Sequence, residues 1–477
     1  MTDKNSIIFR TFRTYKNAYV YDRHTNSVVA VSEEEYQELR QVEKGLMKPE
    51  ESAAIAKYQK QGMFQPNIVK ELRHPQTDII EHNSERKLQQ LILQVTQQCN
   101  LRCEYCAYSG IYEGNRTHSS KRMSFETAKK AIDFFFDHSV ENSEVAIGFY
   151  GGEPLLEFDL ITKCVEYIKE KNEGKEVRLG MTTNGTLLEG KRAEFLAENR
   201  FSIGISLDGS KKEHDACRKF PDGSGSFDLV MNHVKQLEER YPDYVKDCVK
   251  FFTTVNPYMD LGCVLEYFNA SDVINNDAIL FNNMVSVGLK DEVSYEESYF
   301  QVRSYEYIKT LFSMIGKLDR KYVSRLMVDS RARAVRRWKS LHKKTEIGPM
   351  EYQAGPCMPG ILRLFVRYDG SFFPCERVNE NLDYYQIGSV DDGFYLDRMK
   401  NLLNLGKLTE EECKECWNLR NCLMCSNQIE FHGNDRPCKK DKLEVCRGNK
   451  KETEFELYQQ CVLREFGYTP EAKEMWR

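Results

Sequence analysis

The stretch "QQCNLRCEYCAYSG" (residues 97–110) holds three cysteines, Cys99, Cys103 and Cys106, in a CxxxCxxC arrangement. Three thiolates cannot complete a closed tetrahedral zinc site, which takes four ligands and usually spaces them as CxxC pairs. A cubane iron-sulfur cluster on three cysteines instead leaves one iron open for a further ligand. The triplet therefore predicts a cluster with an open iron.

The overall composition limits the partners of such a site. The chain has 477 residues and a formal net charge of -5, which gives no general attraction to nucleic acid or to an anionic membrane, so neither is expected as a partner. It begins without an apolar signal segment and has no run of about 18 apolar residues, so a cytoplasmic location is expected. Because the cytosol keeps thiols reduced, the 16 cysteines favour metal or redox chemistry over disulfides.

Short apolar runs alternate with helical stretches from residue 91 onward, which is typical of parallel βα units. The strands are expected at residues 91–96, 145–150, 177–183, 202–207, 249–255 and 278–285. Six such units predict an α/β fold built on a partial (β/α)6 TIM barrel. Five of these strands run into the cysteine triplet, "GGEP", "NGT", "DGS" and "NP". Because the C-terminal strand ends of such barrels carry the chemistry, all five segments are expected at one mouth.

The motif "CNLRCEYC", with Tyr105 before its third cysteine, resembles the signature of the radical S-adenosylmethionine (SAM) enzymes. The resemblance covers residues from about 88 to 290. It implies a [4Fe-4S] cluster on the triplet whose open iron binds SAM, and it places Tyr105 among the cofactor-binding residues. Such a cluster donates an electron that cleaves SAM to a 5'-deoxyadenosyl radical, which removes a hydrogen atom from the substrate.

The same resemblance assigns SAM contacts to residues at the other strand ends. Gly151, Gly152 and Glu153 of "YGGEP" would face the methionine ammonium, because glycines let the backbone approach a ligand. Polar contacts to the SAM carboxylate and ribose would come from Asn184, Ser206 and Arg218. An arginine suits a carboxylate because its planar fork pairs with both oxygens. The alternative for these last three residues is an ordinary role in turns and at the surface.

A second set of cysteines, between residues 357 and 446, resembles the SPASM extension of radical SAM enzymes, which binds two auxiliary [4Fe-4S] clusters. The first auxiliary cluster would take Cys357, Cys375 and Cys425, and the second Cys413, Cys416 and Cys422 with Cys438 or Cys446. The CxxC spacing that ends this set departs from the usual CxxxC, which leaves the allocation open. With three ligands, the first cluster has room for a substrate thiolate. Two structural zinc sites are the alternative, because thiolate tetrads suit zinc as well.

The region before the barrel predicts a small separate module. Residues 7–31 alternate apolar and polar positions around a "DRHTN" turn, which indicates an antiparallel meander, and helical patterns follow at 32–46 and 50–63. This order resembles the winged-helix recognition element of peptide maturases, which takes a leader segment as an added strand. A module that only packs against the barrel is the alternative.

These patterns divide the chain into five expected segments. They are a leader-recognition module at 1–85, the radical SAM partial barrel at 86–315, a helical bridge at 316–350, the SPASM domain at 351–450 and a C-terminal helix at 451–477. The bridge contains a basic helical stretch at 331–344.

The resemblance as a whole implies a maturase that joins a substrate cysteine sulfur to a carbon, similar to sactipeptide and ranthipeptide synthases of the freyrasin kind. Its partners would be a cysteine-containing precursor peptide and flavodoxin or a similar electron donor. One alternative is an anaerobic sulfatase maturase, which oxidises a Cys or Ser to formylglycine. That family has an aspartate base directly after the cysteine that corresponds to Cys375, where this chain has Glu376. A non-catalytic iron-sulfur scaffold is the alternative from another class.

Overall fold

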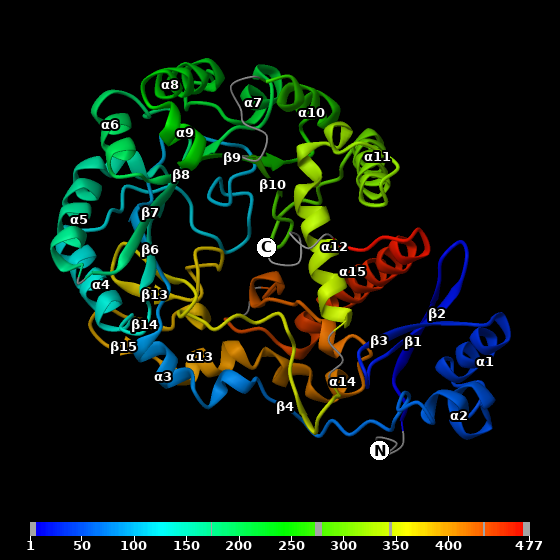
Figure 1. The fold of residues 1–477 in the computed structure, drawn as a ribbon. Helices are drawn as coiled ribbons and strands as arrows, with labels where there is room; N and C mark the ends of the chain where they lie inside the picture. Colours follow the sequence, from blue (N-terminus) through cyan, green and yellow to red (C-terminus); the bar gives the residue numbers. More distant parts are fainter. Residues whose placement is uncertain (1–5, 173, 272–278, 343–345, 433–434, 471–477) are drawn as a thin grey trace.

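Six parallel strands lie side by side in chain order and form most of a curved sheet (Figure 1). The computed structural model describes residues 6–172, 174–271, 279–342, 346–432 and 435–470. The strands are β5 (Gln90–Thr96), β6 (Glu144–Gly151), β7 (Glu176–Thr183), β8 (Ser202–Ser206), β9 (Val249–Val255) and β10 (Ile279–Asn283). They confirm the six strands predicted from the sequence, although residue 278 lies outside the described residues.

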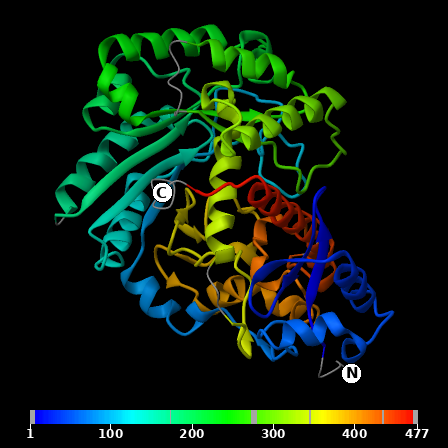
Figure 2. The same cartoon turned by 45° about the vertical axis from the view of Figure 1, so that its right-hand side comes forward.

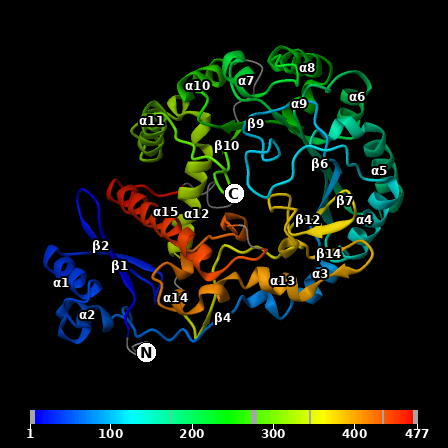
Figure 3. The same cartoon turned by 180° about the vertical axis from the view of Figure 1, so that it is seen from behind.

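Helices follow these strands and lie along the outer side of the curved sheet, as Figures 1 and 3 show from opposite sides. They are α4 (Phe125–Asp137), α5 (Phe158–Lys171), α6 (Gly190–Glu198), α7 (Lys211–Cys217), α8 (Phe227–Arg240), α9 (Pro242–Cys248), α10 (Leu261–Ala270) and α11 (Glu297–Met314). β5 is buried from Leu91 to its end, as expected for a parallel strand covered on both faces.

The cysteine-rich region continues the same sheet. β12 (Leu364–Val366) pairs in parallel with β5, and β13 (Ser371–Phe373), β14 (Gly388–Ser389) and β15 (Gly393–Phe394) follow it in antiparallel order. The sheet therefore has ten strands and is mixed. The sequence pattern predicted a separate domain here, but the region shares one hydrophobic core with the barrel. This connection places Cys375 and Glu376 directly after β13.

The N-terminal module is the expected meander followed by helices. β1 (Phe9–Arg13), β2 (Ala18–Asp22) and β3 (Ser27–Val31) form a separate antiparallel sheet, and α1 (Glu33–Glu43) and α2 (Ala53–Gln59) follow. Ser32 and Glu35 form a capping box that fixes the start of α1. The module has a small hydrophobic core of its own between the sheet and the helices, and Phe64 lies in this core. The module lies beside the long C-terminal helix (Figure 2). Residues 1–5 lie outside the described part.

The remaining elements join the module to the barrel. They are β4 (Glu71–Leu72), which pairs with β11 (Met350–Glu351), and the helices α3 (Ile80–Arg86), α12 (Val328–His342), α13 (Leu396–Leu403), α14 (Glu410–Lys414) and α15 (Lys439–Glu465). Short 3-10 turns lie at Pro49–Glu51, Pro75–Thr77, Pro154–Glu157, Arg320–Tyr322, Arg325–Met327, Asp383–Tyr385, Leu405–Thr409, Leu419–Asn421 and Ser426–Gln428. Among the described residues, no helix is long and apolar enough to cross a membrane.

Two of these helices differ from the sequence expectation in their ends. α12 confirms the basic helix expected at 331–344 as far as His342, and residues 343–344 lie outside the described part. α15 starts at Lys439, well before the expected start at 451, so Cys446 lies on this helix. Residues 471–477 of the expected C-terminal helix are outside the described part.

Candidate active site

The loop after β5 carries the cysteine triplet, and the end of β6 packs directly against it. A Cβ atom on Gly152 would lie 2.1 Å from the Gln98 carbonyl oxygen, and one on Gly151 would lie 2.0 Å from the Thr96 oxygen. Gly151 also has a φ of +150°, which disfavours residues with a side chain. Both glycines are therefore required for this close packing. Their expected contact with SAM stays a prediction.

The three thiols of the triplet lie close enough to act on one another electrostatically. Burial raises the pKa of Cys103 to about 12 and that of Cys99 to about 11. Backbone amides donate to two of the sulfurs, from Leu101 to Cys99 Sγ at 3.4 Å and from Tyr108 to Cys106 Sγ at 3.4 Å. Donors aimed at sulfur suit thiolate ligands, so this donor set fits an iron-sulfur cluster. Over the described ranges, no group of three or more His, Cys, Asp or Glu side chains is arranged for a single metal ion.

Glu153 ties the end of β6 to the end of β7. Its buried carboxylate accepts hydrogen bonds from Thr183 Oγ1 at 2.8 Å and from the Asn184 amide at 2.7 Å. Burial raises the pKa of Glu153. The Asn184 side chain in turn donates to Asn100 Oδ1 at 2.8 Å and lies 3.8 Å from Cys99 Sγ. Glu153 thus positions Asn184 on the cysteine loop, and a SAM contact by either residue stays a prediction.

Asp208 is a buried hub that the sequence analysis missed, although "DGS" after the fourth strand marks its place. It accepts from Arg218 Nε at 2.7 Å, from the Thr254 amide at 2.9 Å and from the Tyr105 hydroxyl. The Arg218 guanidinium is therefore already paired with a carboxylate of the protein. Its expected pairing with SAM stays a prediction. Ser206 is buried at the end of β8, beside this hub.

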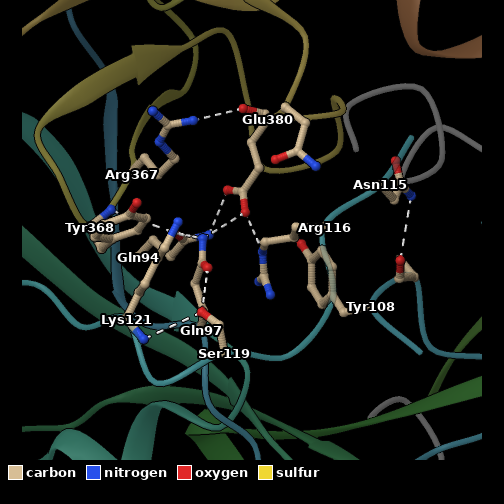
Figure 4. A network of polar contacts seen from close by, with 12 residues as sticks. Gln94, Gln97, Tyr108, Asn115, Arg116, Ser119, Lys121, Arg367, Tyr368 and Glu380 are labelled. Atoms are coloured by element: carbon tan, nitrogen blue, oxygen red, sulfur yellow. Dashed lines mark hydrogen bonds and ion pairs between the residues drawn. The ribbon is translucent and has the colours of Figure 1, made fainter. Parts of the chain in front are cut away.

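A second buried network surrounds Glu380, which the sequence analysis also missed (Figure 4). Its carboxylate accepts from Gln94 Nε2 at 2.6 Å and from Gln97 Nε2 at 3.1 Å, and it forms an ion pair with Arg116. The Arg116 guanidinium lies 3.4 Å from the centre of the Tyr108 ring. The network therefore fastens the loop after Cys375 to β5 and to the loop that carries the triplet.

Glu376 lies near Cys357 and Cys375 and near Tyr150. Its Oε1 accepts from Arg363 Nη1 at 2.6 Å, whereas Oε2 is buried and has no hydrogen-bond partner among the described residues. Tyr150, at the end of β6, is hydrogen bonded to Tyr108. The neighbouring Tyr108 hydroxyl, burial and the Glu376 charge hold the pKa of Tyr150 well above its ordinary value. The two tyrosines thus link the triplet loop to Glu376.

The second cysteine set separates into two groups. Cys357, Cys375 and Cys425 act on one another electrostatically, and Cys357 and Cys375 also lie near Glu376. Cys446 does so with Cys413, Cys416 and Cys422. Cys438 is exposed at the N-cap of α15, and the choice between it and Cys446 as a ligand stays a prediction. A Cβ atom on Gly355 would lie 2.2 Å from the Met424 oxygen, so glycine is needed where the Cys357 and Cys425 loops meet.

Comparison with known proteins agrees with this geometry. The Radical SAM superfamily matches residues 93–268, which include the triplet, the glycine turn and Asp208. The cysteine-type anaerobic sulfatase-maturating enzyme of Clostridium perfringens is 26% identical over 342 residues, 70% of this chain and 86% of the relative. The serine-type enzyme of Bacteroides thetaiotaomicron is 35% identical over 145 residues, 30% of this chain and 34% of the relative.

A solved structure of anSMEcpe with bound AdoMet and Cp18Cys peptide has the same fold. It matches with a TM-score of 0.56 at 23% identity and covers 80% of this chain and 99% of that chain. The family match thus places residues 93–268 in the Radical SAM superfamily, and the solved structure shares the fold.

Proposed function

We propose that this protein oxidises a cysteine in a peptide or protein segment, with Glu376 as the base. The observation that carries the proposal is the buried Oε2 of Glu376, for which the described part of the chain offers no hydrogen-bond partner. A carboxylate oxygen that no protein donor uses is available to take a proton from a bound substrate. Arg363 holds the other oxygen, so the free oxygen has a fixed direction.

The residues around Glu376 suit a reaction that removes a hydrogen atom, a proton and an electron. When bound, SAM and the clusters supply the 5'-deoxyadenosyl radical that takes the hydrogen atom and a sink for the electron. Glu376 takes the proton of the substrate thiol. Tyr150 and Tyr108 line the side toward the triplet, and the ion pair of Glu380 with Arg116 holds that side in place.

The first candidate product is formylglycine. The substrate cysteine loses a hydrogen atom from Cβ and its thiol proton, which leaves a carbon-sulfur double bond once the electron has departed. Water then replaces sulfur, and hydrogen sulfide leaves. The likeness to the cysteine-type sulfatase-maturating enzyme over 70% of the chain supports this candidate. Glu376, where that family has an aspartate, keeps the carboxylate that the reaction needs.

The second candidate product is a thioether in a ribosomally made peptide, and the N-terminal module favours it. β3 pairs with β2 on one side, and within the described ranges no strand pairs with its other side. A cavity of about 580 Å³ lies along β3 and is lined by Val29, Met63 and Leu341 among others. An edge strand beside a groove can take a peptide leader as an added strand and hold it near the barrel.

The experiment that separates the two candidates follows deuterium. Reduced, reconstituted protein is given SAM and the Cp18Cys peptide with its cysteine deuterated at Cβ. Formylglycine formation puts deuterium into 5'-deoxyadenosine and leaves an aldehyde where the thiol was. The same peptide with alanine in place of cysteine is the control.

Thioether formation gives a different result with a different probe. Cysteine-rich peptides encoded beside the gene should lose two hydrogens for each crosslink and resist alkylation, with no aldehyde. Deuterium would then come from the acceptor carbon and not from the cysteine Cβ. If both kinds of peptide keep their thiols while SAM is cleaved, oxidation of cysteine is wrong.

A further inference from the structure

Lys442 is a fully buried lysine that faces the second auxiliary cysteine group. It lies in the first turn of α15 with an exposed fraction of 0%. Its Nζ donates to Thr409 Oγ1 at 2.5 Å and lies 3.6 Å from Cys413 Sγ. Across the described residues no carboxylate forms an ion pair with Lys442, and nearby Glu412 is paired with Lys439 instead.

An ammonium group in a protein interior is costly unless a negative charge opposes it. Lys442 faces cysteine sulfurs, which carry negative charge when they hold a metal centre, and its charge also acts on the Glu412 carboxylate. Its charge acts on Cys422 and Cys446 as well as on Cys413. Gln353 Nε2 also donates to Cys422 Sγ, at 3.3 Å. A cation and an amide donor on one group of sulfurs fit an anionic iron-sulfur centre.

The first auxiliary group has a different electrostatic environment. Cys357 and Cys375 lie beside the carboxylate of Glu376, which Arg363 pairs on one oxygen. The structure thus places a carboxylate with its paired arginine next to one cysteine group. Next to the other it places a lysine for which the described residues provide no ion pair. Reduction adds negative charge to a cluster, so a nearby cation and hydrogen bonds to the sulfurs stabilise the reduced form.

We propose that Lys442 is the counter-cation of the centre on Cys413, Cys416, Cys422 and Cys446. Together with Gln353 it raises the reduction potential of this centre above that of the centre on Cys357, Cys375 and Cys425. The inference rests on the cluster assignment used in the proposed function, but not on the identity of the substrate. This order of potentials directs an electron that leaves the substrate beside Glu376 toward the second centre, from which a one-electron redox protein can take it.

The test is a redox titration of the reconstituted full-length protein, followed by electron paramagnetic resonance without any peptide. Lys442→Met keeps the length of the side chain and removes its charge and donor. We expect the one-electron equilibrium of one cluster to shift about tenfold toward its oxidised form, which makes its midpoint potential about 59 mV more negative. The potentials of the other clusters should stay unchanged. Gln353→Leu should move the same signal in the same direction by less.

The matched control is Lys440→Met, which removes the same charge from the same turn of α15. The Lys440 side chain is 81% exposed and points to Glu444, so no cluster potential should change. If Lys442→Met binds less iron, Gln353→Leu carries the test. An unshifted potential in a fully loaded Lys442→Met or Gln353→Leu protein, an equal shift in Lys440→Met, or zinc in place of iron on Cys413 and its partners would overturn the inference. None of these outcomes depends on peptide oxidation, so the proposed function is tested separately.

Discussion

The guanidinium of Arg23 donates a hydrogen bond to the main-chain carbonyl of Lys414, with Nη1 and the oxygen 2.6 Å apart. Arg23 belongs to the turn between β2 and β3, and Lys414 lies between two cysteines of the second auxiliary group. The same side chain donates to the Cys416 carbonyl at 3.3 Å and to Asn67 Oδ1 at 2.5 Å. The N-terminal module is therefore fastened to the cysteine loop by a side chain that is only 2% exposed.

Replacing Arg23 should loosen this contact. Arg23→Met leaves the carbonyls of Lys414 and Cys416 buried without their donor, and hydrogen bonds to charged groups contribute about 1.5–3 kcal/mol. We expect the free energy of unfolding in urea to fall by about 2–3 kcal/mol. Arg13→Met is the control, because Arg13 forms an exposed ion pair with Glu33 and should change little. Equal stability of the two variants would show that Arg23 does not anchor the module.

The contacts of Asp208 predict that a more conservative substitution, Asp208→Asn, lowers the free energy of unfolding by more than Arg23→Met does. Asp208→Asn keeps the shape of the side chain but leaves the buried Arg218 guanidinium without a negative partner. Breaking a buried ion pair in this way costs about 3–5 kcal/mol. Chemical unfolding of the variant should show this loss, together with weaker cluster loading at the triplet beside it. Asp247→Asn tests the specificity, because Asp247 pairs with Arg200 on the surface and should be tolerated.

Local patterns in the sequence were enough for much of this molecule. Apolar runs between helical stretches predicted β5 to β10, and cysteine spacing predicted the triplet, because both depend on neighbours in the chain. The position of Asp208 could have been predicted, because "DGS" follows a predicted strand. Its hydrogen-bond partners could not, because a single aspartate in a sequence does not indicate them.

Pairs that are far apart in the sequence could not be predicted. β12 has only three residues, and it pairs with β5 although most of the barrel sequence lies between them. The register of this pair depends on the folded sheet. Glu380 and Lys442 look like ordinary surface charges in the sequence, and only the structure shows that both are buried. The positions of Cys438 and Cys446 likewise depend on where α15 begins.

The glycine turn after β6 gives a prediction about metal content. A Cβ atom on Gly152 would collide with the Gln98 carbonyl oxygen and would lie 2.9 Å from the Cys99 amide nitrogen. Gly152→Ala should therefore displace the triplet loop and remove about a third of the iron bound after reconstitution, if three clusters of equal size are present. Gly448→Ala is the control, because no atom of the described residues lies within 4 Å of a Cβ added there. A full iron content in Gly152→Ala would contradict the packing argument.

Glu380 predicts a pH dependence of stability. Burial raises its pKa above the ordinary 4.5, so the folded state binds the proton more tightly than the unfolded state does. Its contribution to the free energy of unfolding therefore falls as pH rises from the unfolded pKa through the raised folded pKa. The free energy of unfolding of the wild type and of Glu380→Gln is measured from pH 4 upward. The two values should be similar at the lowest pH, and above it the wild-type value should fall more steeply as pH rises. Parallel curves across that range would mean that Glu380 does not titrate with folding.

Glu376 gives the prediction closest to the proposed reaction. Its free Oε2 is assigned to the substrate proton, whereas the radical forms at the separate triplet. Glu376→Gln should therefore still cleave SAM, but peptide oxidation should slow by about 10²–10⁴, the usual contribution of a positioned general base. Glu376→Asp shortens the side chain but keeps the carboxylate, and it should recover part of this rate. The two rates are measured in one assay, as 5'-deoxyadenosine and as modified peptide. Cleavage and oxidation that fall together in Glu376→Gln would indicate a damaged SAM site, and an unchanged oxidation rate would mean that another group takes the proton.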